Sequence, residues 1–137
     1  MVAKKFSKSW NRSTQIRKQR KYRINAPHNI RNKLISSQLT KKLKEIYGKR
    51  SISLRKGDIV KIMVGEFKGK KGKVLNILPK QEKVFIEGVE KTKINGTKFN
   101  VSIHPSNLQI EELILTDKKR IVKKTKQEIN KNKSEKK

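Results

Sequence analysis

The sequence of 137 residues lacks cysteine altogether, holds few acids and few aromatic residues, and has no long apolar run. Without cysteine there is neither a disulfide framework nor a thiolate metal site, which fits a reducing compartment. No apolar stretch approaches the roughly 20 residues of a membrane-spanning helix, and no hydrophobic signal-peptide core is present. The two histidines, His28 and His104, lie in separate segments without carboxylates at ligand spacing, so we expect no metal site.

The scarcity of acids is uneven along the chain. Lys and Arg number 38 against 11 acids, which gives a net charge of +27. Residues 1–57 hold 18 cations and one acid, residues 58–115 hold 10 and seven, and residues 116–137 hold 10 and three. This pattern indicates a nearly balanced globular middle between two polycationic ends. Nucleic acid is the expected partner because it offers dense phosphate, whereas no amphipathic segment with a broad apolar face supports membrane binding.

The same pattern predicts one small domain with extensions. We expect a basic N-terminal extension with short helices over residues 1–50, a barrel over residues 51–115, and a basic tail over residues 116–137 that is helical in part and then disordered.

Residues 54–80 contain the most regular pattern of the barrel. Val60, Ile62 and Val64 occupy alternate positions, which is typical of a half-buried strand. A second apolar run covers residues 74–78. Between the two runs, residues 65–73 combine three glycines with four lysines. We expect the glycines to leave backbone N–H groups free to approach phosphate and the lysines to contact it. The spacing is not that of a nucleotide-binding P-loop.

Further strands complete the predicted barrel. They are expected over residues 83–89, 91–94, 97–103 and 107–110. Asn95-Gly96 supplies a strong hairpin turn signal, and Pro105 ends the strand before it. Five or six short strands rich in turn signals predict a mainly β fold, a small SH3-like barrel.

Helices are predicted outside the barrel, over residues 11–20, 28–35, 38–47 and 117–126. Pro27 suits a first helical turn. Ser36-Ser37 offers an N-cap for the third helix and Gly48 a C-cap. The apolar stripe of that helix is expected to pack on the barrel, and its lysine face lies either in solvent or on RNA.

The first 25 residues interleave nine cations with aromatic residues and hold too few apolar residues for a local core. One interpretation is a disordered, solvated tail. The favoured one, which accounts for Trp10, is an arm that orders on RNA with cations on phosphates and rings on bases. The RNA-binding residues predicted in this arm are Lys4, Lys5, Lys8, Trp10, Arg12, Arg17, Lys18, Arg20, Lys21, Tyr22 and Arg23.

The remaining predicted RNA contacts lie in the glycine-rich turn and at scattered cations. In the turn they are Gly65, Phe67, Lys68, Gly69, Lys70, Lys71, Gly72 and Lys73. Elsewhere they are His28, Arg31, Lys33, Arg50, Arg55, Lys56, Lys98 and His104. Phe67 is the better stacking candidate, whereas Phe99 either stacks or packs in the core. For His104, hydrogen bonding at a strand end is favoured over RNA contact.

No cluster of side chains suggests catalysis. Glu87 and Glu90 flank Gly88, but neither a histidine nor a nucleophile accompanies them, so solvated carboxylates are the preferred interpretation. We therefore expect no enzyme activity, no cofactor and no small-molecule substrate.

Three stretches resemble a known family. They are Ala26 to Leu34 with Leu39 to Leu43 and Arg50-Ser51, then Arg55 to Val74, and finally Asn95-Gly96-Thr97 with Val101, Ile103-His104-Pro105-Ser106 and Leu108. The second stretch resembles the KOW hairpin of SH3-like barrels. The first and third resemble the archaeal and eukaryotic branch of one KOW family, the universal large-subunit ribosomal proteins numbered twenty-four in bacteria and twenty-six in eukaryotes.

This resemblance implies a structural protein of the large ribosomal subunit that binds large-subunit rRNA early in assembly, near the outer opening of the nascent-chain tunnel. It implies neighbouring ribosomal proteins and nascent-chain or targeting factors as partners, and a cytoplasmic ribosome, with nucleolar assembly in a eukaryote. The alternative is a KOW-type transcription elongation or RNA-chaperone module, which would be expected to have an exposed apolar patch for a protein partner and normally a companion domain.

Overall fold

The computed structural model describes residues 6–117 and residue 120. Within these residues it holds seven strands, three α-helices and two short 3-10 helices. In chain order they are η1 (Lys8–Arg12), α1 (Ile16–Asn25), α2 (His28–Leu34), β1 (Ser36–Leu39), α3 (Lys41–Tyr47), β2 (Ser51–Ser53), β3 (Ile59–Ile62), β4 (Lys71–Leu78), β5 (Lys83–Thr92), β6 (Lys98–Ile103), η2 (Pro105–Asn107) and β7 (Leu108–Glu112). No helix of this described part is long and apolar enough to cross a membrane.

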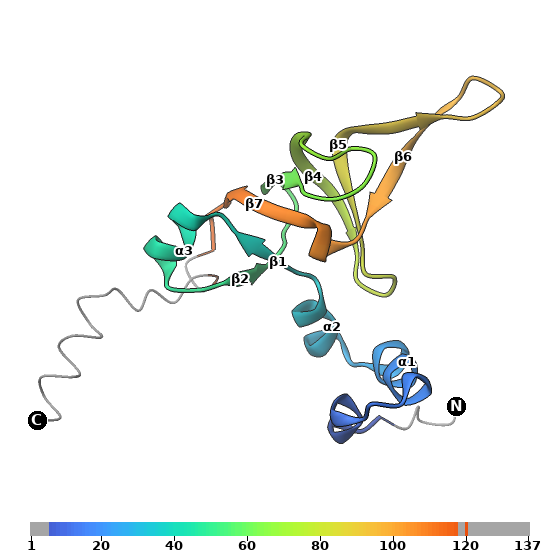
Figure 1. Ribbon diagram of the computed structural model, residues 1–137, viewed down its shortest axis with the longest axis vertical. Helices are drawn as coiled ribbons and strands as arrows, with labels where there is room; N and C mark the ends of the chain where they lie inside the picture. The colour runs from blue at the N-terminus through green and yellow to red at the C-terminus, as the bar shows by residue number, and fades with distance from the viewer. Residues whose placement is uncertain (1–5, 118–119, 121–137) are drawn as a thin grey trace, which may run out of the picture.

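The strands form one sheet in the order β2-β1-β7-β3-β4-β5-β6 (Figure 1). Neighbouring strands are antiparallel except for β1 and β7, which run parallel. The β5–β6 hairpin projects away from the rest of the sheet, and η1, α1 and α2 lie together at the N-terminal side (Figure 1). The fold is mainly β and consistent with a small SH3-like barrel, so the predicted fold class is confirmed.

The core of the sheet is aliphatic. Side chains of successive strand residues point to opposite faces, so alternate positions are buried. Val60 and Ile62 of β3 and Leu108 and Ile110 of β7 are at most 1% exposed. Leu39 of β1 is fully buried in the same cluster. The core therefore draws on a strand that precedes residue 51.

The predicted hairpins are found with shifted ends. β3 ends at Ile62, short of Val64, and β4 begins at Lys71 because Gly72 pairs with Val60 in the ladder. The prediction of two strands over residues 83–89 and 91–94 is wrong: β5 is continuous, and a register shift near Gly88 (φ 74°) bends it. The predicted turn at Asn95-Gly96 is confirmed.

The prediction of a helix over residues 38–47 is also wrong for its first turn. Residues 36–39 form β1, and α3 begins at Lys41 after Thr40 as its N-cap. Ser37 does not cap a helix, since it is buried and its hydroxyl donates to the Pro105 carbonyl at 2.5 Å. Gly48 ends α3 in the left-handed conformation, as predicted (φ 61°).

Of the other predicted helices, one agrees with the structure and one is displaced along the chain. The helix predicted over residues 28–35 is confirmed as α2, whereas α1 begins at Ile16, well inside the range predicted for the first helix. The helix predicted over residues 117–126 lies largely outside the described residues. The pair β1–β2 was not predicted, and it places residues 36–39 in the sheet.

Candidate nucleic-acid interface

The β3–β4 loop presents its lysine side chains rather than its backbone. Gly65 (φ 102°) and Gly69 (φ 89°) hold turns that other residues adopt only with strain. The N–H groups of Lys68, Gly69 and Lys70 donate to carbonyls of Gly65, Ile62 and Phe67 at 3.0, 2.8 and 3.1 Å. The expectation that this backbone is free to bind phosphate is therefore wrong for these three groups. The side chains of Lys68, Lys70, Lys71 and Lys73 are all on exposed residues.

Gly72 has a packing role that its place in the turn did not reveal. A Cβ at this position would lie 2.5 Å from the Glu87 carbonyl oxygen and 2.7 Å from Cγ2 of Ile86. Only glycine therefore lets β4 approach β5 this closely. The glycine faces a neighbouring strand and does not open the loop to a ligand.

The two candidate stacking rings differ from expectation. Phe67 is partly buried and packs against the core, with Nζ of Lys70 5.1 Å and Nζ of Lys91 6.0 Å from its ring centre. Its ring is thus occupied within the protein. Phe99 is 42% exposed and lies outside the core cluster, so its core-packing alternative is wrong. Lys93 Nζ lies 5.8 Å from the Phe99 ring.

The N-terminal arm has a small aromatic core, contrary to expectation. The Phe6 ring lies 5.3 Å from Tyr22 and 6.4 Å from Trp10. The Gln19 side-chain amide donates to three carbonyls in and after η1, and so ties η1 to α1. Tyr22 is only 8% exposed, and its ring serves this core rather than an open stacking surface.

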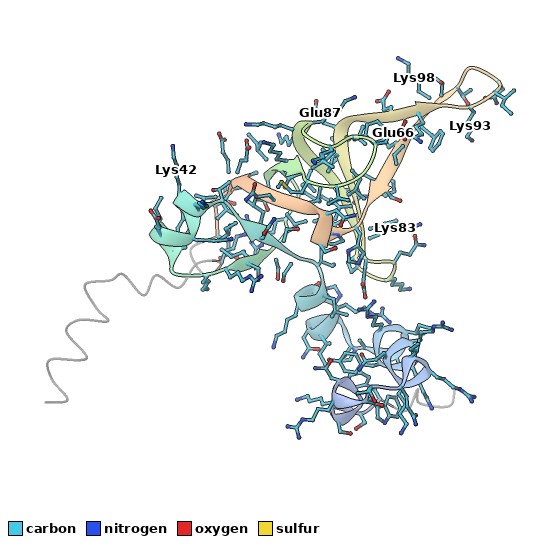
Figure 2. The ribbon with its side chains drawn as sticks, in the orientation of Figure 1. Lys42, Glu66, Lys83, Glu87, Lys93 and Lys98 are labelled. Carbon is cyan, nitrogen blue, oxygen red and sulfur yellow. The ribbon has the colours of Figure 1, made fainter. Side chains whose placement is uncertain are left out.

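The cations of the arm form its outer surface. Those of α1 are all exposed, with no acid in that helix, and Nζ of Lys21 lies 4.9 Å from the Trp10 ring. Figure 2 shows long side chains projecting outward from η1 and α1. The exposed arm cations are Lys8, Arg12, Arg17, Lys18, Arg20, Lys21 and Arg23. Lys4 and Lys5 lie outside the described residues.

Glu82, in the turn between β4 and β5, connects the arm to the barrel. It has φ 54° and its carboxylate lies 3.8 Å from Nη1 of Arg23 and 3.3 Å from Nε2 of His104. Nδ1 of His104 is 2.8 Å from the Ser106 hydroxyl, and the ring caps η2. The favoured interpretation of His104 as a hydrogen-bonding residue at a strand end is confirmed.

The remaining predicted residues do not converge on one point. Arg31 donates to the Ile24 carbonyl at 2.6 Å, Arg55 pairs with Asp117 at 2.9 Å, and Lys71 pairs with Glu111 at 2.7 Å. His28 and Lys33 are exposed on α2, Arg50 and Lys56 in the segments on either side of β2, and Lys98 at the start of β6. The structure thus offers two cationic groups, the arm and the β3–β4 loop, and isolated cations elsewhere.

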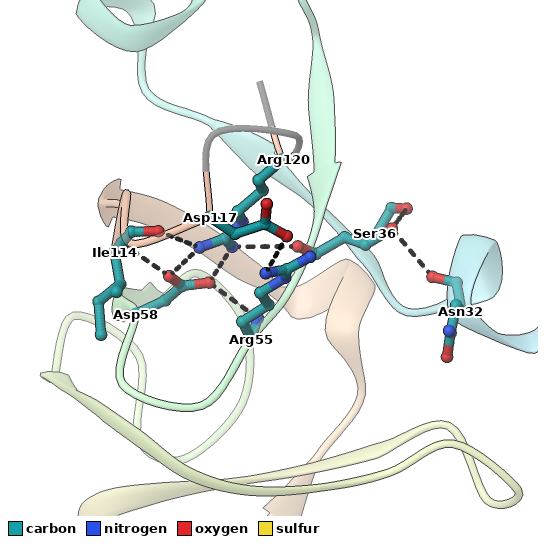
Figure 3. A network of polar contacts seen from close by, with 8 residues as sticks. Asn32, Ser36, Arg55, Asp58, Ile114, Asp117 and Arg120 are labelled. Carbon is teal, nitrogen blue, oxygen red and sulfur yellow. Dashed lines mark hydrogen bonds and ion pairs between the residues drawn. The ribbon is translucent and has the colours of Figure 1, made fainter. Parts of the chain in front are cut away.

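A buried ion pair was missed by sequence reasoning (Figure 3). Asp58 is fully buried, and its carboxylate accepts from both terminal nitrogens of Arg120, one at 2.7 Å. The backbone N–H groups of Arg55 and Ile114 also donate to it, at 2.9 and 3.1 Å. Arg120 donates further to the Ser53 and Ile114 carbonyls. The available signal was an acid directly after Gly57, since residues 1–65 contain only one other acid.

Chemistry other than binding has little support. Among residues 6–117 and 120, no group of three or more His, Cys, Asp or Glu side chains could hold a metal ion. The carboxylates of Glu87 and Glu90 are both on exposed residues of β5. What the described surface offers is cationic side chains on the helices of the arm and on the β3–β4 loop.

Comparison with known proteins bears on this surface. A family model that describes the eukaryotic ribosomal proteins L26 and their archaeal counterparts matches residues 13–127, a range that includes all the strands and α-helices given above. The large ribosomal subunit protein uL24 of Korarchaeum cryptofilum is 43% identical over 103 residues, which cover 75% of this chain and 79% of that protein. The chain therefore belongs to the family that comprises ribosomal protein L26 of eukaryotes and its archaeal counterparts, a family of structural proteins and not of enzymes.

Proposed function

We propose that this protein is a structural constituent of the large ribosomal subunit, where it binds large-subunit rRNA, supports its folding during assembly, and so takes part in translation. The observation that carries the proposal is the cationic surface of the arm on a chain of this family. Residues 1–57 hold 18 Lys and Arg against one acid, and the cations of α1 are all exposed.

The mechanism is the positioning of cations against folded RNA. Each phosphate neutralised releases condensed counterions, so several exposed Lys and Arg together supply most of the affinity. The barrel and the aromatic core of the arm hold the helices in one arrangement. Selectivity then comes from the shape of the rRNA rather than from base edges.

The proposed location is near the outer opening of the nascent-chain tunnel of a cytoplasmic ribosome, with nucleolar assembly in a eukaryote. Neighbouring large-subunit proteins are proposed as partners, together with nascent-chain or targeting factors. The family resemblance supports this location. The projecting β5–β6 hairpin, in which residues 91–100 are all exposed, supplies a surface for such partners (Figure 1).

Sedimentation of the tagged chain through sucrose gradients at moderate and high salt tests the proposal. We expect the protein to travel with the large subunit and to resist a few-fold rise in salt, whereas loose polycation binding falls by about 10³–10⁵ over such a range for several phosphate contacts. Recovery at the top of the gradient would contradict the proposal. Co-purification with RNA polymerase instead would favour the KOW-type transcription elongation or RNA-chaperone alternative.

A further inference from the structure

A cavity of about 350 Å³ lies between α2 and the turn that joins β4 to β5. His28 and Arg31 of α2 line one side, and the end of β4 and the following turn line the other, through Leu78, Pro79, Lys80 and Gln81. In Figure 1 the β4–β5 turn extends toward α1 and α2. The volume lies at the lower end of the range typical of small-ligand sites.

The charges around this cavity are suited to an anion. Arg31 and Lys80 are cations, and none of the described residues that line the cavity is an acid. A second cavity, of about 480 Å³, provides the contrast, because Glu66 and Glu90 in its lining balance the cations Lys91 and Lys98, and Glu66 already pairs with Lys91. A phosphate would therefore be attracted more strongly to the first cavity, whose charged lining is cationic, than to the second, whose charges cancel.

Arg31 is held in place before any ligand arrives. Its Nη2 donates to the Ile24 carbonyl at 2.6 Å, which fixes the guanidinium at the end of α1. Its Nε is buried and has no hydrogen-bond partner among the described residues. An unsatisfied buried donor is unfavourable, so an acceptor brought by a ligand would be stabilising here. The planar guanidinium also offers a face on which a base can stack.

The remaining lining is suited to a nucleobase. Leu78 and Pro79 supply an apolar surface, and the Gln81 amide can both donate to and accept from a base edge. Apolar contacts, an amide and cations within one cavity match the parts of a nucleotide. Double-stranded RNA offers no free base of this kind, whereas loops and bulges do.

We propose that this cavity binds one unstacked nucleotide of rRNA, with its base against Leu78 and Pro79 and its phosphate on Arg31 and Lys80. The inference rests on the proposed function, and it adds a site that selects an unpaired position in the RNA. Glu82 of the same turn pairs with Arg23 of α1 at 3.8 Å, which links the turn to the neighbouring helix.

The test uses the full chain and two hairpin RNAs with the same number of phosphates. One contains a single bulged nucleotide, supplied as a mixture of the four bases, and the other is fully paired. Binding is measured by fluorescence anisotropy at fixed salt. Stacking of one base contributes enough for about a tenfold preference for the bulged RNA. The ratio of the two affinities isolates the cavity from general attraction to phosphate.

Two variants and one matched control complete the test. We expect Lys80→Gln, and Arg31→Lys, which keeps the charge but loses the planar group, to lower the preference at least about threefold. Lys83→Gln removes another exposed cation from the same hairpin, outside the cavity, and should weaken the binding of both RNAs alike (Figure 2). Circular dichroism checks that each variant is folded.

The possible failures are distinct. Tight but equal binding of both RNAs by the native chain overturns the nucleotide site and leaves rRNA binding intact. The nucleotide site is also overturned if Lys83→Gln and Lys80→Gln lower the preference for the bulged RNA equally. Whether a lysine lines the cavity would then make no difference to the preference. Failure to bind either RNA contradicts the proposed function itself.

Discussion

The barrel and the N-terminal arm are stabilised in different ways. The barrel buries 12 aliphatic side chains in one cluster. Between residues 6 and 34 only Tyr22 and Ala26 are buried, and the surface around them is cationic. Burial of apolar area is insensitive to charge, whereas the arm must hold together against repulsion between its own cations. We therefore expect the barrel to be stable by itself and the arm to gain order from screening or from phosphate.

The largest expected effect comes from removing β1 from the barrel. A chain beginning at residue 35 should fold, because residues 6–34 contribute no side chain to the main core. A chain beginning at residue 51 loses Ile35 and Leu39 from the core and leaves β2 without its partner, so we expect no cooperative unfolding transition. Thermal denaturation followed by circular dichroism compares the two. A cooperative transition in the shorter chain would show that residues 51–115 form the barrel alone.

Breaking the buried ion pair should be the next largest effect. Asp58→Ala leaves the Arg120 guanidinium buried without its carboxylate, which typically costs about 3–5 kcal/mol of the free energy of unfolding. Urea denaturation measures the loss. Glu111→Gln is the control, because its ion pair with the 57%-exposed Lys71 side chain should contribute at most about 1 kcal/mol. Similar losses in both variants would contradict the structural role of Asp58.

Truncating the aromatic core should affect the arm alone. Tyr22→Ala removes the buried ring beside Phe6, so Trp10 should become exposed and its emission should shift to the red. Trp10 is the only tryptophan in the chain and reports on the arm without interference. The free energy of unfolding of the barrel should change by less than about 0.5 kcal/mol.

Tyr47→Ala is the matched control for this comparison. Tyr47 packs partly against the barrel core, so its truncation should destabilise the barrel and leave the Trp10 emission unchanged. An arm that lost order in both variants would mean that the two regions unfold together.

The smallest expected effect is that of salt. Raising the ionic strength from about 0.01 M to about 0.1 M shortens the Debye length from about 30 Å to about 10 Å. Repulsion within α1 then weakens, and the arm should become more ordered by less than about 1 kcal/mol. Trp10 emission and amide hydrogen exchange in α1 measure the change. Unchanged exchange in α1 would show that repulsion does not limit the order of the arm.

The hairpin strands of the barrel were predictable because a hairpin is specified by residues that are close together in the sequence. Alternating apolar residues and the Asn95-Gly96 turn specify a hairpin within a few residues. β1 was missed because Ser36-Ser37 has the composition of an N-cap. What places it in the sheet is a hydrogen bond from Ser37 to Pro105, 68 residues away, together with pairing to β7. Contacts of that separation leave no periodic trace in the sequence.

The sequence was enough to predict which segments of the candidate interface are rich in cations, but only partly the role of each residue in them. Counting cations located the arm and the β3–β4 loop, because charge is read directly from sequence. The burial of Tyr22, the occupied ring of Phe67 and the packing role of Gly72 depend on tertiary neighbours. Arg120 was missed for the same reason, since its partner Asp58 is 62 residues away.

The parallel pairing of β1 with β7 also sets the order of events during synthesis. Residues 38 and 39 must wait for residues 109 and 110 before their ladder can form. Helices η1 and α1 contact each other over a short stretch of chain and can form as soon as both have been made. Contacts between distant residues form more slowly than local ones. A chain whose translation stalled before residue 108 would therefore present its cationic helices without a completed barrel behind them.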